Sequence, residues 1–231
     1  GFDFKANVSN GFALPGGSIR YNRDANVDPS EVWQYEAGVE YDYKNLVKVN
    51  LTGFILETSK EVNETILGSG VFVNSGKTQR HGLELGIRAQ PVRRLNFNGS
   101  FAYIRTEIKK NVDEALVGKE LNNIPRTVTN LMLDYTLESG LGARVNYRNV
   151  GKYATGLENF FYYNGYSRTD ATLFFNFAGT SSKRGQLFVE FNNIFNENYA
   201  TYVFDNGGPN DGQSYSASAP RNFSIGVSYN F

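Results

Sequence analysis

The 231-residue sequence has no cysteine and only one histidine, His81. Without cysteine the chain forms neither a disulfide nor a thiolate metal site, so its stability must come from strand pairing and burial. A single histidine also excludes sites built on paired histidines, and a Ser-His-Asp triad would depend on His81 alone. We therefore expect no catalytic residues, no metal site and no cofactor.

Long apolar runs are missing as well. Hydrophobic residues make up 40% of the sequence, the mean hydropathy is -0.42, and no stretch approaches the roughly 20 consecutive apolar residues of a membrane-spanning helix. The 23 basic residues balance the 23 acidic residues, which gives a formal net charge of +0. This balance leaves no electrostatic footprint for binding nucleic acid.

Aromatic residues are abundant, with 18 Phe and 15 Tyr beside 24 Gly. Aromatic side chains favour pleated strands, and tyrosine also favours the boundary between lipid and water. In the last ten residues, small or polar side chains alternate with five apolar ones: Phe223, Ile225, Val227, Tyr229 and Phe231. Because strand side chains point alternately to opposite faces, this segment indicates a wall with lipid on one side and water on the other.

The same alternation recurs along the whole sequence, in about ten segments that suit tilted membrane-crossing strands. These segments are residues 2–9, 33–42, 46–58, 83–89, 95–103, 131–137, 141–147, 171–177, 187–191 and 222–231. Their number and spacing predict an all-β antiparallel fold.

The connections between these segments alternate in length. Short turns are expected near Lys44, Val92, Ser139 and Ser182, and long loops at 10–30, 59–71, 109–125, 154–165 and 202–219. Short periplasmic turns and long extracellular loops are typical of an outer-membrane β-barrel. Alternation alone also fits a soluble β-sandwich or a lipocalin-like barrel, but the strand count, the loop asymmetry and the terminal Phe231 favour a transmembrane β-barrel.

Four motifs then resemble one family, the TonB-dependent outer-membrane receptors. The segment Trp33–Glu40 resembles the family's Trp/Tyr-Glu-x-Gly strand, and Asn74-Ser75-Gly76 followed by His81–Leu85 resembles its Asn-x-Gly loop and the strand start after it. The segment Asn192–Tyr199 resembles the Asn-Leu-Phe-Asp-x-x-Tyr segment of the penultimate strand. Phe231, with Tyr229 on the same face, resembles the family's terminal assembly signal.

The resemblance implies a 22-stranded barrel of which residues 1–231 are the C-terminal ten strands. The plug domain, the TonB box and the first strands would precede Gly1, and Gly1-Phe2-Asp3-Phe4-Lys5 lacks the features of a secretory signal. It also implies a Gram-negative outer membrane and uptake of a scarce nutrient, most commonly a ferric siderophore complex. The expected partners are outer-membrane lipid, the barrel assembly machinery, TonB through the N-terminal region, and a small iron chelate.

Ligand-binding residues are expected on the extracellular loops, where exposed rings can stack on a chelate. The candidates are Phe160, Phe161, Tyr162 and Tyr163, joined by Tyr202, Phe204 and Tyr215 from the last loop. The alternative is that these rings form the aromatic girdle at the lipid headgroups. Three basic residues, Arg20, Arg23 and Lys77, would attract an anionic chelate or simply solvate the loops.

The competing function is a self-contained ten-stranded barrel that acts as a membrane enzyme, an adhesin or a small pore. Acidic pairs such as Glu36 and Glu40, or Asp134 and Asp170, would have to supply its acid-base chemistry. In a barrel these carboxylates are more simply lumen groups that pair with Arg88, Arg144 or Arg148, or that face a plug. The sequence shows no catalytic cluster, so we expect no enzyme.

Overall fold

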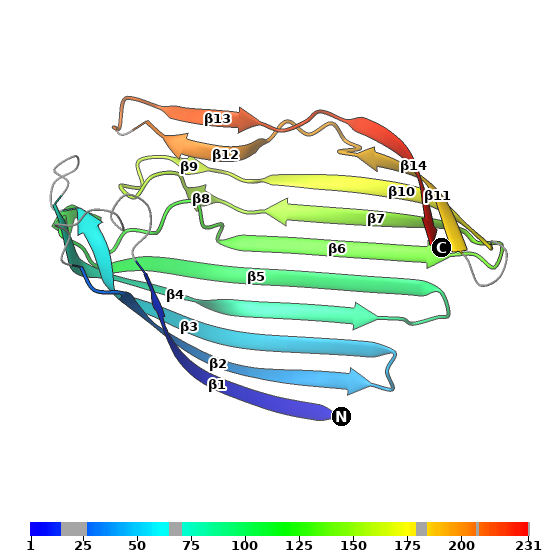
Figure 1. The fold of residues 1–231 in the computed structure, drawn as a ribbon, viewed down its shortest axis with the longest axis horizontal. Coiled ribbons are helices and arrows are strands. Elements are labelled where there is room, and N and C mark those ends of the chain that lie inside the picture. The colour runs from blue at the N-terminus through cyan, green and yellow to red at the C-terminus, as the bar shows by residue number, and fades with distance from the viewer. Residues whose placement is uncertain (15–26, 65–70, 179–183, 207, 231) are drawn as a thin grey trace.

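The computed structural model describes residues 1–14, 27–64, 71–178, 184–206 and 208–230. Ten strands form one sheet in which every strand is antiparallel to its neighbours, in the order β1-β2-β3-β4-β5-β6-β7-β10-β11-β14 (Figure 1). Their bounds are β1 Phe2–Ala13, β2 Ser30–Tyr43, β3 Val47–Glu64, β4 Phe72–Ala89, β5 Leu95–Lys110, β6 Thr127–Thr136, β7 Leu141–Val150, β10 Tyr166–Ala178, β11 Arg184–Asn192 and β14 Asn222–Asn230. The all-β antiparallel prediction is confirmed.

Two small hairpins stand beside the sheet at its long-loop end. They are β8 (Tyr153–Ala154) with β9 (Tyr162–Tyr163), and β12 (Ala200–Asp205) with β13 (Gln213–Ala217). A 3-10 helix, η2 (Glu114–Leu116), lies in the connection between β5 and β6. The described residues contain no helix that is long and apolar enough to cross a membrane.

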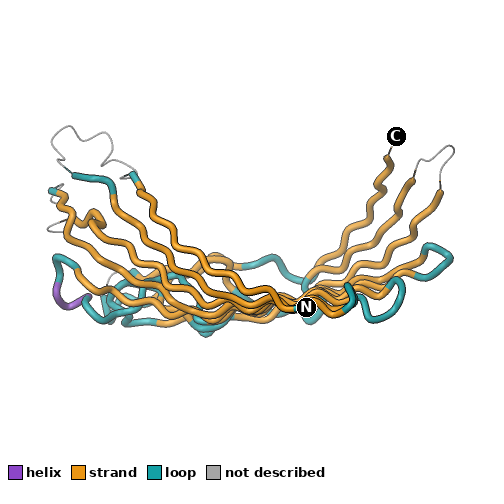
Figure 2. The backbone as a smooth tube through the Cα atoms, turned by 90° about the horizontal axis from the view of Figure 1, so that it is seen from below, coloured by secondary structure: helices purple, strands orange, loops and turns teal. Residues whose placement is uncertain are grey.

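The sheet is an open, curved trough, with β1 and β14 at opposite edges (Figure 2). Among the described residues, β1 pairs only with β2 and β14 pairs only with β11. A closed ten-stranded barrel would need β1 to pair with β14, so the chain by itself does not form one. Each edge strand leaves one row of backbone groups without a strand partner.

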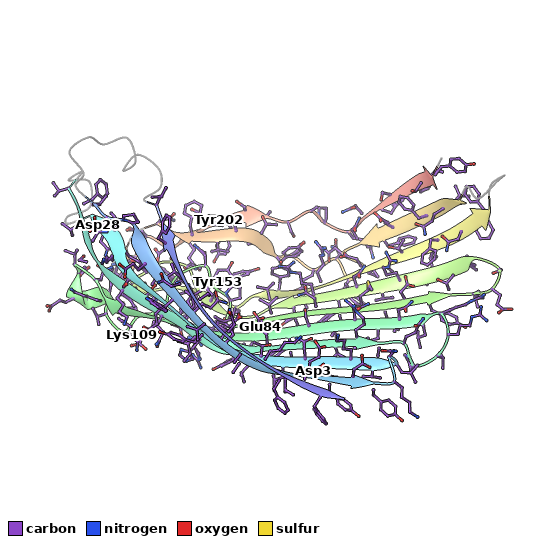
Figure 3. The ribbon with its side chains drawn as sticks, turned by 60° about the horizontal axis from the view of Figure 1, so that its bottom comes forward. Asp3, Asp28, Glu84, Lys109, Tyr153 and Tyr202 are labelled. Carbon is purple, nitrogen blue, oxygen red and sulfur yellow. The ribbon has the colours of Figure 1, made fainter. Side chains whose placement is uncertain are left out.

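Side chains project from both faces of the sheet (Figure 3), and each face has its own character. One face, called the apolar face, carries exposed large hydrophobic residues on nearly every strand: Phe4, Tyr35, Ile55, Leu83, Leu133, Val145, Leu173, Leu187 and Ile225. The other, the polar face, carries the charged and amide residues. Nothing in the described part of the chain packs on the apolar face as the second sheet of a sandwich would, so the sandwich alternative is wrong.

Phenylalanine rings on the polar face repeatedly cover a glycine of the next strand. Phe54 lies directly opposite Gly82, and Phe174 lies opposite Gly142. A Cβ atom built on Gly142 would overlap the Phe174 ring, and one built on Gly82 would lie only 3.1 Å from the Phe54 ring. Such pairing protects a backbone position that has no side chain, and it lets a curved wall accept bulky rings.

The tight turn between β2 and β3 was predicted at Asp42–Asn45, and the structure confirms it. Lys44 and Asn45 both have positive φ, 51° and 57°, as a type I′ hairpin requires. The Asp42 carboxylate also accepts a hydrogen bond from the Asn45 backbone N–H at 2.9 Å. The turn predicted near Ser182 lies outside the described residues.

Several predicted loops are shorter than expected because the strands continue through them. Residues 10–13 belong to β1, residues 59–64 to β3 and residues 109–110 to β5. At roughly 3.3 Å per residue, an 18-residue strand such as β3 spans about 60 Å, which is twice a hydrocarbon core of about 30 Å. Beyond the lipid no apolar face is required, so the alternation fades there although the backbone pairing continues.

The other two corrections are the hairpins. The connections 154–165 and 202–219 were expected to be loops, but they contain β9 and most of β12 and β13. Two-residue strands such as β8 and β9 carry no periodic signal at all. In β12 and β13, Ser216 stands opposite Tyr202 and Ser214 opposite Phe204, so the pattern of the segment indicated a polar loop.

The motif Asn192–Tyr199 folds into a turn that ends β11 and is held by Asn193. The Asn193 side chain is 2% exposed; it donates to the Glu197 carbonyl at 2.9 Å and accepts from the Glu197 backbone N–H at 2.8 Å. The Asn193 backbone N–H donates to the Asp170 carboxylate of β10. Asn193 also has a φ of 53°, which asparagine tolerates better than most residues.

The glycine pairing predicts that Gly142→Ala weakens the barrel wall. The added methyl group would overlap the Phe174 ring and approach the Tyr135 carbonyl oxygen at 2.8 Å, and overpacking of this kind costs about 1–3 kcal/mol. We expect a lower yield of folded, heat-modifiable protein on SDS gels. The matched control is Gly53→Ala, where the nearest atom, Cδ2 of Leu83, would lie at an ordinary 3.5 Å. Equal yields for the two variants would contradict the prediction.

The turn predicts that Asn193→Ala opens residues 193–199. The variant loses two local hydrogen bonds and places alanine at positive φ, which together cost about 1–3 kcal/mol. Hydrogen exchange of the Glu197 amide should accelerate by the factor that corresponds to this loss of local stability. Asn193→Gly relieves the φ strain but does not restore the lost hydrogen bonds. The Glu197 amide of this variant should therefore exchange nearly as fast as in Asn193→Ala. Asn198→Ala, at an exposed position of the same turn, should leave exchange unchanged.

Candidate ligand-binding site

The polar face is organised by ion pairs between neighbouring strands. Arg144 of β7 donates to Asp134 of β6 with Nη2 at 2.9 Å, and Lys48 of β3 lies 2.7 Å from Glu40 of β2. The predicted pairing of lumen carboxylates with arginine is thus confirmed for Arg144. Among the described residues, neither Arg88 nor Arg148 has an acidic partner.

A hollow of about 660 Å³ lies on this face, over β2 to β10. Its charged lining residues are Glu40, Lys48, Arg88, Arg148, Arg168 and Asp170. Arg148 stands directly opposite Arg168 in the register of β7 and β10, and Arg168 is neutralised by Asp170 at 2.8 Å. Arg148 therefore leaves the hollow with an uncompensated positive charge on this side.

At the long-loop end, three residues form what we call the Tyr162 cluster: Arg126, Lys152 and Tyr162. Arg126 immediately precedes β6 and Lys152 follows β7, and the Arg126 backbone N–H donates to the Lys152 carbonyl at 3.0 Å. Their charged groups lie over the Tyr162 ring, at 5.4 Å for the Arg126 guanidinium carbon and 4.4 Å for the Lys152 Nζ. These are cation–π distances.

The cluster carries net positive charge. Glu120 from the β5–β6 connection binds Arg126 through both oxygens, at 2.8 Å and 3.1 Å. Lys152 has no acidic partner among the described residues. One balanced arginine, one unbalanced lysine and a phenol hydroxyl together can hold an anion such as a carboxylate or a catecholate.

Tyr163 has a different role from its neighbour, because adjacent strand residues point to opposite sides. Its hydroxyl accepts a hydrogen bond from the Ala200 backbone N–H at 2.9 Å. Its ring lies 5.5 Å from the Tyr153 ring and 6.4 Å from the Tyr215 ring. Tyr163 therefore joins the two small hairpins.

The remaining predicted ligand residues lie at three places. Phe160 is exposed in the turn between β8 and β9, and the Phe161 carbonyl accepts from the Thr155 backbone N–H at 3.1 Å. Tyr202 is 51% and Tyr215 57% exposed on the β12–β13 hairpin. The Tyr202 ring lies 5.8 Å from that of Phe204, so this hairpin presents an aromatic surface to solvent.

Two of the other predicted residues, Lys77 and Tyr229, have defined partners in the structure. Lys77 of β4 pairs with Glu57 at 3.3 Å, so it is not a free cation. Tyr229 stacks on Phe177 with ring centroids 6.4 Å apart, whereas Phe231, Arg20 and Arg23 lie outside the described residues. No group of three or more potential metal-ligating side chains occurs in the described part of the chain.

The sequence reasoning missed Arg126, Lys152 and Asn159. Asn159 fastens two connections together, because its side chain donates to the Glu120 carbonyl at 2.9 Å and accepts from the Glu120 backbone N–H at 2.8 Å. The positions of Arg126 and Lys152 in the sequence do carry a signal. Each stands next to a strand end bordering a long loop, at an even-numbered position that continues the polar face of its strand.

Burial gives Tyr153 an unusual environment. It is 8% exposed, and burial, reinforced by the neighbouring phenols Tyr163, Tyr166 and Tyr202, raises the pKa of its hydroxyl. Tyr153 and Tyr202 lie in the same region of the molecule (Figure 3). Because the folded pKa is raised, the contribution of Tyr153 to stability is complete below the ordinary tyrosine pKa of about 10 and is lost as the pH rises above it.

The amino-acid sequence is similar to those of curated receptors. The chain is 24% identical over 211 residues to the probable TonB-dependent siderophore receptor PiuA of Acinetobacter baumannii, covering 85% of this chain and 27% of the relative. It is 27% identical over 234 residues to the metal-pseudopaline receptor CntO of Pseudomonas aeruginosa, covering 98% of this chain and 31% of the relative. The chain thus spans less than a third of the length of these relatives.

Solved structures share the fold. The ferric preacinetobactin receptor BauA from Acinetobacter baumannii superposes with a TM-score of 0.78 at 19% identity, covering all of this chain and 34% of that one. The ferric citrate transporter FecA, in its unliganded form, superposes with a TM-score of 0.77 at 18% identity, covering 99% and 36%.

A family model described as TonB-dependent receptor-like β-barrel matches residues 1–194, which is most of the chain. The match agrees with the sheet topology, with the apolar face and with the relatives above. The chain therefore belongs to the TonB-dependent receptor-like β-barrel family, the transport receptors of the Gram-negative outer membrane.

Proposed function

We propose that residues 1–231 are the C-terminal part of the barrel of an outer-membrane receptor that imports a ferric siderophore complex with energy from TonB. The observation that carries the proposal is the family match over residues 1–194. It is supported by a relative that is named as a siderophore receptor. The complete protein is called the full-length receptor below.

The open sheet supports a larger barrel, of 22 strands. A backbone group left unpaired in hydrocarbon costs several kcal/mol, and both β1 and β14 have an outer edge with no partner among the described residues. Further strands of the same protein would pair with both edges. The plug domain and the TonB box would precede them, so TonB would act through the N-terminal region.

The coding DNA upstream of Gly1 tests this part of the proposal directly. It should encode, in order, a signal peptide, a short TonB box, a plug domain and about a dozen further strands. An upstream sequence without a plug and without strands would leave the open edges unexplained and would sink the proposal.

The apolar face supplies the membrane contact, with outer-membrane lipid as its partner. Tyr229 and Phe231 would serve as the signal that the barrel assembly machinery reads. The members of the family are transport receptors. We therefore assign the chain a transport role.

The cargo would bind at the long-loop end, where the Tyr162 cluster offers positive charge and a phenol. Ferric siderophores carry catecholate, hydroxamate or carboxylate groups, which are anionic or strongly polarised acceptors. The exposed rings of Phe160, Tyr202 and Tyr215, with the half-buried ring of Phe161, would add apolar contact. Tyr163 would contribute through its neighbours.

This site predicts that Arg126→Gln combined with Lys152→Gln weakens binding of an anionic ferric chelate. We expect at least a tenfold rise in Kd, which corresponds to about 1.4 kcal/mol. The measurement is equilibrium binding of radioactive ferric catecholate and ferric hydroxamate chelates to cells that express the full-length receptor. Lys109→Gln, which removes a cation paired with Glu107 outside the cluster, is the matched control and should bind normally.

The aromatic candidates are tested separately. Changing Phe160, Tyr162 and Tyr163 to alanine together should raise the Kd more than tenfold, whereas Tyr162→Phe should keep most of the affinity because the ring over the cations remains. Unchanged affinity in the triple variant would show that this loop does not contact cargo.

A further inference from the structure

We propose that β8, β9, β12 and β13 form one rigid body, the hairpin unit, which does not rearrange when cargo binds and in which Tyr163 is a positioning residue for Tyr162. Its role in uptake rests on the proposed function, but its rigidity is a property of the fold alone. The inference comes from contacts between two hairpins that are separate in sequence.

The hairpin unit has a core of its own. Val203 of β12 and Ala154 of β8 are both 0% exposed, and Tyr153 and Ala200 are also buried. Of the described large hydrophobic side chains on the ten sheet strands, by contrast, only Ile108, Val150 and Phe174 are buried. Separating the hairpins would expose this core to water, which the hydrophobic effect opposes.

Polar bonds cross between the hairpins within the same core. Thr155, 2% exposed, accepts a hydrogen bond from Gln213 Nε2 at 2.7 Å. Gln213 is oriented in turn by the Tyr215 hydroxyl, which donates to its Oε1 at 2.7 Å. Because buried polar groups are costly to leave unpaired, sliding of one hairpin against the other is opposed as well.

The backbones also approach closely. A Cβ atom built on Gly156, which follows β8, would lie 2.9 Å from the Cβ of Asp205 in β12. Glycine at position 156 thus permits a contact that a larger residue would push apart. The Asp205 side chain of one hairpin therefore lies against the main chain of Gly156 beside the other.

The hairpin unit is fastened to the barrel at two further points. The Asn123 backbone N–H, in the β5–β6 connection, donates to the Ala154 carbonyl at 2.8 Å. Arg168 of β10 donates to the hydroxyl of Tyr199, which directly precedes β12, at 3.2 Å. Asn159 binds Glu120, the residue that also holds Arg126. The fixed unit therefore sets the position of Tyr162 relative to Arg126 and Lys152.

A disulfide across the unit tests its rigidity in the full-length receptor. The chain has no cysteine of its own, so Gly156→Cys with Asp205→Cys introduces a single pair in this region. The separation of 2.9 Å is slightly below the usual Cβ separation of about 3.5–4.5 Å in disulfides. A second pair, Thr155→Cys with Gln213→Cys, covers the case in which the first distorts the fold.

We expect the disulfide to form equally well with and without ferric chelate, and the oxidised receptor to take up chelate within twofold of the reduced receptor. Loss of uptake that a reductant restores would show that the hairpins move apart, and would overturn the proposal. The control pair, Phe204→Cys with Ser214→Cys, joins opposite residues within one hairpin and leaves relative motion of the hairpins free.

Hydrogen exchange gives a readout that needs no cargo. The amides of Thr155 and Ala200 should exchange at the same rate in the receptor, and Val203→Ser should accelerate both together. Exchange of one hairpin without the other would overturn the proposal. A receptor that imports no ferric chelate would contradict the proposed function but would leave this result fully interpretable.

The positioning role of Tyr163 is tested by coupling. Tyr163→Ala should raise the Kd for chelate severalfold, and Tyr163→Phe, which keeps the ring, should recover most of the loss. In a Tyr162→Ala receptor the additional change Tyr163→Ala should have little further effect. Fully additive effects would show that Tyr163 does not act through Tyr162.

Discussion

Pairing of backbone hydrogen bonds is the constraint on which the rest of the structure depends. In hydrocarbon each N–H and C=O must find a partner within the protein, and eight of the ten sheet strands do so on both sides. The requirement fixes the simple order of the sheet, in which each strand lies beside its nearest sheet strand in the chain. Among the described residues, the outer edges of β1 and β14 are the two places in the ten-stranded sheet where this requirement is not met.

Once the pairing is fixed, the two faces follow from the period of two. Every strand that crosses the lipid presents large apolar side chains to one side and charged or amide groups to the other. The polar side then has to satisfy its own charges, which it does with pairs such as Arg144 with Asp134. Phenylalanine rings on it lie opposite glycines of a neighbouring strand, as at Gly142 and Gly82. Register, charge pairing and glycine placement are therefore three consequences of one geometry.

The sequence predicted the parts of the fold that depend on local periodicity and turn chemistry. The alternation located all ten sheet strands, and Asp42–Asn45 showed its turn residues plainly. The hairpins were not predictable, because contacts such as Thr155 with Gln213 join residues that are far apart in the chain. Within the candidate site, the aromatic content pointed to the correct loop. It did not distinguish Tyr162 from Tyr163, because a strand of two residues is too short to reveal which side each ring faces.

The charges of β7 connect the wall to the site. Arg144 and Arg148 lie in β7, and Lys152 lies two residues beyond its end. The three recur every four residues, which at the usual strand rise is a spacing of about 13 Å on one face. Only the innermost, Arg144, is balanced by an acidic side chain within the described residues. A row of cations that is balanced at the turn end and unbalanced toward the long loops creates a potential that grows more positive toward the loops. Negative charge is attracted most strongly there, at the end where the hairpin unit holds Tyr162 against Lys152. The strand pairing that satisfies the backbone hydrogen bonds within the lipid thus also sets the spacing of the cations that an anionic ligand would meet.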